Sequence, residues 1–307
     1  MLSITCRPKM FKQVVGNSSE VKALRTVLSR DNDELPHAFL FVGPSGCGKT
    51  TLARITARKL GCRGRDLSEW NASAFRGIDS AREIVRMSNL MPVGKNSTCK
   101  VWLLEECHGL SKDAQEALLH LLEDGCPKQA FFILTTTEPE KLKETFKRRC
   151  STYTVAALLE EELKDFLTET CAQKKTKVPE KVIDQIVLDS LGSCGIALAV
   201  LDKIINLPPK EMLEAAEKVA QEKSESIELC RKLFAKAPWK VISAILRGLT
   251  NDPEGVRRQV LQYCASVLLK KDNAQAYIVM DAFRETFFYS GRPGLVLACY
   301  EAVKREE

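Results

Sequence analysis

A glycine-rich loop behind a short apolar run constrains this chain more than any other feature. The run covers residues 38–42, and the pattern G-x-x-x-x-G-K-[ST] follows it, carried by Gly43, Gly48, Lys49 and Thr50. Glycines let the backbone curl so that successive N–H groups point at one phosphate cluster, and the next helix presents its positive end to the same anion. Lys49 then reaches the β- and γ-phosphates, and Thr50 offers a hydroxyl to Mg²⁺. The pattern predicts a strand, a phosphate-binding loop and a helix; the alternative is a plain glycine turn.

A second apolar run ends in two acidic residues. Residues 101–104 are apolar, and Glu105 and Glu106 follow them directly. A buried strand whose carboxyl end meets a ligand has this layout. In phosphate-loop ATPases that position holds an acid for the Mg²⁺ shell, and an adjacent glutamate polarises the attacking water. We expect these roles for the two acids; the alternative is the start of a solvated loop.

Composition bounds the class of protein. The 307 residues predict two or three domains, and the net charge of +6 permits a nucleic-acid partner without arguing for one. The twelve cysteines are scattered, with no C-x₂-C pair, so free thiols in a reducing cytoplasm are expected. The start of the chain lacks a signal-peptide layout, and no apolar run is long enough for a membrane span.

Periodicity predicts an α/β part followed by an all-α part. Fully apolar strands alternating with helices up to residue 156 favour a parallel sheet covered on both faces. A helix is expected from Ser18 or Ser19, with the hydroxyl as its cap. Beyond residue 156 we expect only helices, with Gly192 as a stop and with Pro238 and Pro253 in first turns. Their expected ranges are 158–172, 180–191, 196–205, 209–222, 225–235, 238–249, 253–270, 272–289 and from 293 onward.

Six segments, taken in order over residues 4–205, resemble the clamp-loader ATPase subunits of the AAA+ class. This family includes the gamma/tau subunits of bacterial clamp loaders, the small subunits of replication factor C and their phage counterparts. The segments are RPKMFKQVVGN on the adenine side, PHAFLFVGPSGCGKTTLA (Walker A), NASAFRGIDSAREIV, KVWLLEECHGLSKDAQEALLHLLED (Walker B and central helix), FFILTTTEPEKL (sensor 1) and KRRC (arginine finger).

The resemblance implies a RecA-like parallel-sheet core at residues 1–156, a helical lid at 157–222 and a helical collar for oligomerisation at 223–307. It implies an ATP hydrolase that works with Mg²⁺ in a ring of subunits, a pentamer. ATP binding and hydrolysis would open a sliding clamp and place it on primed-template DNA. No membrane partner is expected, and the location would be the cytoplasm, or the host cytoplasm for a viral protein.

The resemblance also assigns site residues. The expected catalytic residues are Lys49, Glu105, Glu106, Thr137 at the sensor position and Arg149, which would act on the neighbour's ATP. Thr50 and Glu105 would hold the metal. The expected nucleotide contacts are Arg7, Pro8, Val15, Gly16, Gly43, Pro44, Ser45, Gly46, Cys47, Gly48, Lys49, Thr50 and Thr51. The alternative for Arg149 is a solvated basic pair with its neighbour.

Departures from the family pattern keep two rivals open. Glu105 stands where aspartate is usual, and Gly195 stands where the lid offers an arginine. Arg148 replaces the usual serine, and the four-cysteine zinc module of gamma/tau is missing, which favours replication factor C and phage subunits. The rivals are a non-catalytic, nucleotide-binding subunit that donates Arg149, and another AAA+ DNA motor such as a branch-migration helicase.

Weaker signals are left with two readings each. Cys47 is either an oxidisable thiol at a helix N-terminus or a passive loop residue. His108 is expected to be structural or on the surface. An apolar tip at 90–92 either touches a clamp or packs in the core. Backbone contacts to DNA, or ordinary exposed charges, are expected at Arg76, Gly77, Arg82, Arg86, Ser111 and Lys112.

Overall fold

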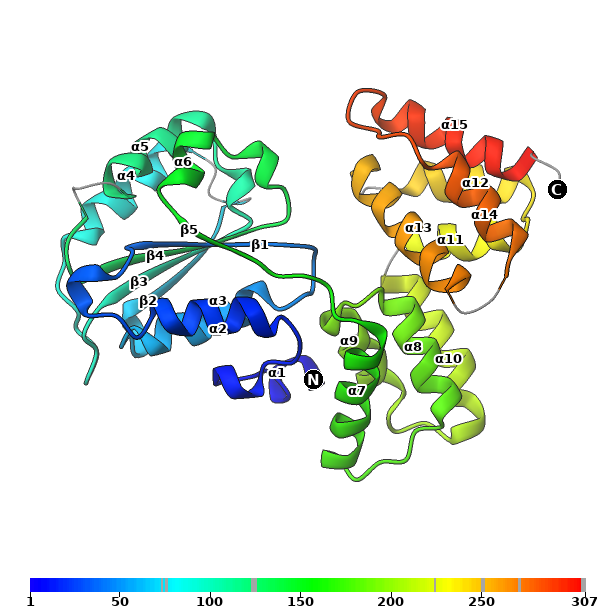
Figure 1. Ribbon diagram of the computed structural model, residues 1–307, viewed down its shortest axis with the longest axis horizontal. Helices are drawn as coiled ribbons and strands as arrows, with labels where there is room; N and C mark the ends of the chain where they lie inside the picture. The colour runs from blue at the N-terminus through cyan, green and yellow to red at the C-terminus, as the bar shows by residue number, and fades with distance from the viewer. Residues whose placement is uncertain are drawn as a thin grey trace. The chain divides into compact units, whose positions relative to one another are not determined.

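The chain folds into two compact units (Figure 1). The computed structural model describes residues 1–72, 74, 77–122, 126–223, 225–249, 252–269 and 272–304. The first unit, residues 4–158, is called the sheet unit here, and the second, residues 1–3 with 159–307, the helical unit. The DNA-contact candidate Arg76 lies outside the described residues.

Five parallel strands form the centre of the sheet unit. They are β1 (Ala38–Val42), β2 (Leu67–Asn71), β3 (Lys100–Glu105), β4 (Ala130–Thr136) and β5 (Ser151–Thr154). Their order in the sheet is β2-β3-β4-β1-β5, with every neighbouring pair parallel. The expected parallel sheet is therefore confirmed. Because β4 lies between β1 and β3, the loops that follow these three strands meet at one edge.

Helices cover both faces of this sheet, as predicted (Figure 1). On one face, Phe39 and Phe41 of β1 pack in one apolar cluster with α2 (Ser18–Val27) and α3 (Lys49–Lys59). On the other, Leu40 belongs to a second cluster. That cluster includes residues of α4 (Ile78–Ser88), α5 (Lys112–Leu122) and α6 (Glu144–Arg148). Successive strand residues point to opposite faces, so a continuous apolar run satisfies both clusters.

The start of α2 differs from the prediction. The helix begins at Ser18, but neither serine caps it; the capping position belongs to Asn17, which is left-handed at φ 51° and makes no side-chain cap bond. Its amide instead donates to the carbonyl of Ala156 at 3.1 Å and accepts the N–H of Ala156 at 2.8 Å. A contact with the end of the sheet unit therefore replaces the local cap.

The helical unit has no strand among its described residues. Its helices are α7 (Glu160–Gln173), α8 (Glu180–Ser190), α9 (Cys194–Ile204), α10 (Pro209–Lys223), α11 (Glu225–Phe234), α12 (Trp239–Gly248), α13 (Pro253–Leu268), α14 (Ala274–Ala282) and α15 (Gly291–Lys304). A short α1 (Leu2–Thr5), which we did not predict, begins the chain. The all-α character after the sheet is thus confirmed, while the boundary between lid and collar at 222 and 223 stays a prediction.

Helix ends show where local signals hold and where they fail. Asp252 caps α13 through a bond from the N–H of Gly255 at 2.9 Å, with Pro253 in the first turn as predicted. Pro238 precedes α12 instead of entering its first turn. The helix α8 ends at Ser190, close to the stop predicted at Gly192. The left-handed backbone there includes Leu191 at φ 48° as well as Gly192 at φ 75°. The helix expected at 272–289 ends at Ala282, for a reason given in the Discussion.

A buried ion pair ties α8 to α11. Asp189 on α8 is 1% exposed and pairs with Arg231 on α11, which also donates to the carbonyl of Glu217 at 3.2 Å. Gln185 adds a bond to Asp189 at 3.0 Å. Burial raises the pKa of Asp189, and the charge of Arg231 opposes only part of this shift. The helices on the two sides of the predicted lid–collar boundary are thus joined by a buried charge.

Candidate functional site

The loop between β1 and α3 is shaped by its glycines. A Cβ added at Gly43 would lie 2.0 Å from the carbonyl oxygen of Val155, so only glycine fits beside β5. Gly46 at φ 74° and Gly48 at φ 101° are both left-handed, a region in which side chains are strained. The backbone therefore turns back on itself before α3 begins at Lys49, as the motif predicts.

The side chain of Lys49 lies inside this loop. The residue is only 6% exposed, and its ammonium donates to the carbonyl oxygens of Gly43 at 2.8 Å and Pro44 at 2.7 Å. Burial lowers the pKa of Lys49, and the charge of Glu106 opposes part of that shift. A buried cation whose bonding partners are neutral carbonyls is suited to receive an anion at the helix N-terminus.

Cys47 is not an acidic thiol. It is 7% exposed, and burial raises its pKa to about 11, with Lys49 opposing the shift only in part. The low pKa that an oxidisable loop thiol needs is therefore contradicted, and the passive reading stands.

Glu105 ends β3 with one carboxylate oxygen unused. Its Oε1 is buried and accepts no hydrogen bond within the described residues, although Nη2 of Arg54 lies 3.9 Å away. Arg54 is engaged by Glu69 of β2 in a two-point pair at 2.7 and 2.8 Å. A buried carboxylate oxygen without a donor fits the needs of a hard divalent cation. The described residues contain no group of three His, Cys, Asp or Glu placed to hold a metal, so a Mg²⁺ here would depend on phosphate and water ligands as well.

The carboxylate of Glu106 lies near the end of β4. Its backbone is left-handed at φ 51° and ψ 47°. The hydroxyl of Thr137, just after β4, donates to Oε2 of Glu106 at 3.4 Å. The structure thus brings together Lys49, Glu106 and Thr137, which the sequence placed 31 to 88 residues apart. Their catalytic roles stay predictions.

His108 is the member of this cluster that sequence reasoning set aside. It lies in a 3-10 turn (Cys107–Gly109), and its side chain is 15% exposed. Its Nδ1 is 3.1 Å from Oγ1 of Thr136 and 3.4 Å from Oε2 of Glu106, and its Nε2 is 3.1 Å from Oε1 of Glu138. The one signal in the sequence was its position two residues after the acid pair, which says nothing about the direction of a side chain.

Other predicted residues lie elsewhere in the chain or in the phosphate loop itself. Arg149 is exposed at the end of α6, directly before β5. Ser45, Gly46 and Thr51 belong to the loop and the start of α3. The adenine-side residues are half-buried in the segment before α2: Arg7, Pro8, Val15 and Gly16. Gly195 lies in the first turn of α9.

Among the DNA-contact candidates, the described arginines and Lys112 are exposed. Arg82 lies 3.7 Å from Asp79 at a solvated position, and Arg86 is exposed on the same helix. Ser111 caps α5 by accepting the N–H of Ala114 at 3.1 Å. Its hydroxyl therefore has a structural partner, and the reading as an ordinary cap gains support at this position.

The apolar tip after α4 is not in the core. Of the tip residues 90–92, Leu90 is 54% exposed, Met91 is 67% exposed and Pro92 is half-buried, and the neighbouring Val93 is 77% exposed. The loop is held from below by Asp66, itself 1% exposed, which accepts the N–H groups of Val93 at 3.0 Å and Gly94 at 2.7 Å. Core packing, our default explanation for this tip, was wrong, because a buried carboxylate fixes the backbone and leaves the apolar side chains outside.

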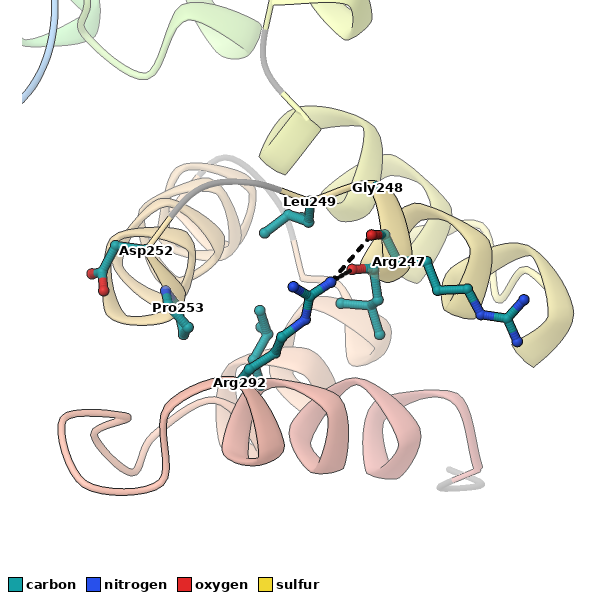
Figure 2. Close-up of a pocket in the computed structure, with 8 residues that line it drawn as sticks. Arg247, Gly248, Leu249, Asp252, Pro253 and Arg292 are labelled. Atoms are coloured by element: carbon teal, nitrogen blue, oxygen red, sulfur yellow. Dashed lines mark hydrogen bonds between the residues drawn. The ribbon is translucent and has the colours of Figure 1, made fainter.

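A pocket of about 540 Å³ lies in the helical unit between α12, α13 and α15. Figure 2 shows the guanidinium of Arg292 reaching from α15 to the end of α12. There it donates to the carbonyls of Leu246 at 2.7 Å and Arg247 at 3.2 Å. These bonds satisfy terminal helix carbonyls, so we read this pocket as a packing feature.

Residues 39–157 match the ATPase family associated with various cellular activities (AAA). Over 222 residues the chain is 31% identical to the DNA polymerase III subunit gamma/tau of Mycobacterium tuberculosis, covering 65% of this chain and 38% of that protein. It is also 31% identical over 222 residues to the DNA polymerase III subunit gamma of Buchnera aphidicola, covering 66% and 60%. The chain thus spans less than two thirds of the length of these relatives.

Solved structures of Thermotoga maritima RuvB have a similar fold. One superposes with a TM-score of 0.60 at 19% identity, covering 87% of this chain and 86% of that one. Another, a RuvB Holliday junction branch migration motor, gives 0.57 at 20% identity. Likeness at this identity concerns the fold alone. Among the described residues, no helix is both long and apolar enough to cross a membrane.

Proposed function

Because residues 39–157 form an ATPase domain of the AAA family, in a chain related to DNA polymerase III gamma/tau subunits, we propose that this protein is an ATPase subunit of a DNA sliding-clamp loader. One observation supports the proposal. Lys49, buried in the loop after β1, and the contact between Glu106 and Thr137, after β3 and β4, lie at the same carboxyl edge of the sheet.

The chemistry follows from where these groups lie. Lys49 and the N–H groups of the 43–50 loop would bind the β- and γ-phosphates of ATP. Glu106 would orient the attacking water and accept its proton, and Thr137 would bind the γ-phosphate beside it. Thr50 and Glu105 are the residues that would hold Mg²⁺, which when bound neutralises charge on the phosphate oxygens.

The partners of the proposed subunit are its neighbours in a pentameric ring, a sliding clamp and primed-template DNA. The exposure of Arg149 supports a role toward the ATP of a neighbour, where an arginine contributes on the order of 10³–10⁵ in rate. The exposed tip formed by Leu90, Met91 and Val93 supports contact with a clamp, since apolar side chains held outside a core favour a protein partner.

The test is the rate of ATP hydrolysis by the full chain with its partner subunits, with and without clamp and primed-template DNA. We expect clamp and DNA together to stimulate turnover, and Glu106→Gln to lower it roughly 10²- to 10⁴-fold while nucleotide binding persists. Glu116→Gln is the matched control, because Glu116 is 64% exposed on α5 and has no proposed role in hydrolysis.

Two outcomes would contradict the proposal. A Glu106→Gln variant as fast as the wild type would favour the non-catalytic subunit that the substitutions at Glu105 and Gly195 suggest. ATP-driven movement of DNA junctions without a clamp would instead favour another AAA+ motor.

A further inference from the structure

The imidazole ring of His108 lies between a carboxylate that follows β3 and another that follows β4. Its two nitrogens face carboxylates on opposite sides: Glu106 at 3.4 Å from Nδ1 and Glu138 at 3.1 Å from Nε2. An ionised carboxylate only accepts hydrogen bonds, so the ring can donate to one of them as a neutral imidazole and to both as an imidazolium. The hydroxyl of Thr136, fully buried and 3.1 Å from Nδ1, holds the ring from a third direction.

We propose that His108 is a positioning residue that orients the carboxylate of Glu106 for hydrolysis and links it to Glu138 at the end of β4. This inference rests on the proposed function, because it assumes that Glu106 acts on the attacking water. The hydroxyl of Thr137 lies at the same 3.4 Å from Oε2 of Glu106, which is long for an O–H donor, so neither contact alone would fix the carboxylate. Without the ring, the Thr137 contact would remain.

The anchor of the ring is itself fixed. The N–H of Glu138 donates to Oγ1 of Thr136 at 3.0 Å, and the carboxylate of Glu138 pairs with Lys141. Thr136 continues β4, and its carbonyl accepts the N–H of Gly43 at 3.2 Å. A chain of hydrogen bonds therefore runs from the first glycine of the phosphate loop through Thr136 to His108, whose ring lies 3.4 Å from Glu106. A group that orients another through such bonds typically changes activity by about 10- to 100-fold when removed.

The experiment measures kcat and nucleotide affinity for His108→Ala and His108→Gln in the full chain with its partner subunits. We expect kcat to fall about 10- to 100-fold in His108→Ala, with nucleotide affinity within about twofold of the wild type. His108→Gln keeps one N–H donor and should recover part of the loss. His37→Ala is the control, because His37 is a half-buried histidine at the opposite end of the sheet, bonded to the carbonyl of Ala130 at 2.7 Å.

A double variant separates orientation from simple stability. If His108 acts through Glu106, adding His108→Ala to Glu106→Gln should slow turnover little further, whereas independent effects would multiply. Multiplying effects, or a kcat of His108→Ala equal to the wild type while Glu106→Gln is slow, would overturn the inference. A Glu106→Gln variant with full turnover would instead overturn the proposed function. Should His108→Ala fail to fold, Glu138→Gln carries the same test, because it removes the charge that holds the ring at Nε2, and unchanged kcat in it would count against the inference.

Discussion

Charges at the edge of the sheet and the Glu254–Arg257 pair of the helical unit are bonded in opposite ways. At the edge, Lys49 donates to two neutral carbonyls, and Oε1 of Glu105 accepts no hydrogen bond within the described residues. In α13, Arg257 donates to Glu254 at 2.8 to 3.0 Å and to the carbonyls of Phe283 at 3.1 Å and Arg284 at 3.2 Å.

The second arrangement is saturated. Glu254 also accepts the N–H of Phe287 at 2.8 Å. Together the pair bonds the backbone of residues 283–287, which a longer α14 would have bonded within itself, and this accounts for the early end of that helix at Ala282. In this comparison, the pair whose bonds are largely made within the protein serves the fold, while the charges at the edge of the sheet have bonding capacity left for a ligand.

The largest effect that would test this contrast is expected from Lys49→Ala. Turnover should fall about 10²- to 10³-fold, as when one preorganised donor to a developing charge is lost. The melting temperature should not fall, because burial lowers the pKa of Lys49 and its charged form is disfavoured in the folded state. For the same reason the wild type should gain stability as pH rises from the folded pKa toward 10.5, and the variant should lack this gain.

Lys59→Ala, exposed at the end of the same helix, is the control for Lys49→Ala. Unchanged ATP turnover in Lys49→Ala would show that Lys49 does not bind the phosphates during hydrolysis.

A smaller effect, and on stability instead of turnover, is expected from Arg257→Ala. Removing one partner of a buried pair leaves the other uncompensated and costs about 3–5 kcal/mol of unfolding free energy, measured by denaturant. Burial raises the pKa of Glu254, but Arg257 and the N–H of Phe287 outweigh it and hold the pKa below its usual value. The stability from this pair is therefore present above the ordinary pKa of 4.5 and is lost as pH falls through the folded value.

Arg258→Ala sharpens that measurement. Arg258 lies 3.5 Å from the same carboxylate but is 55% exposed, so its loss should cost about 1 kcal/mol or less. Equal losses for the two arginines would show that saturation does not distinguish them.

The smallest effect is expected from Cys47→Ala, because Cys47 lies in the loop but carries no charge. Turnover should stay within about twofold of the wild type, because a thiol whose pKa is about 11 is protonated at neutral pH. Site-resolved alkylation followed by mass spectrometry should find Cys47 slower than the more exposed Cys6. Rapid labelling of Cys47 would mean that the loop opens far more than its burial indicates.

Much of the fold was predictable because its signals are local. The strand, loop and helix around Lys49 were predicted from the thirteen adjacent residues 38–50, and the first turn of α13 from Pro253. Predictions failed where a distant group replaced a local one. Asn17 stands at the cap position of α2, where we predicted a serine, and its side chain bonds the backbone of Ala156. Glu254 and Arg257 bond backbone groups that follow α14, where we predicted a longer helix. Such partners lie 26 to 139 residues away, beyond any local pattern.

The order of letters was enough to establish a parallel sheet with phosphate-loop chemistry and an all-helical remainder, since periodicity and glycine spacing act over a few residues. It could not place His108 between Glu106 and Glu138, or hold Leu90 and Met91 outside the core over the carboxylate of Asp66. The first arrangement follows from the strand order, which puts β4 beside β3. The second follows from the hydrogen bonds that Asp66, before β2, accepts from backbone 27 and 28 residues later. Strand order depends on contacts between distant segments, and these exist only in the folded chain.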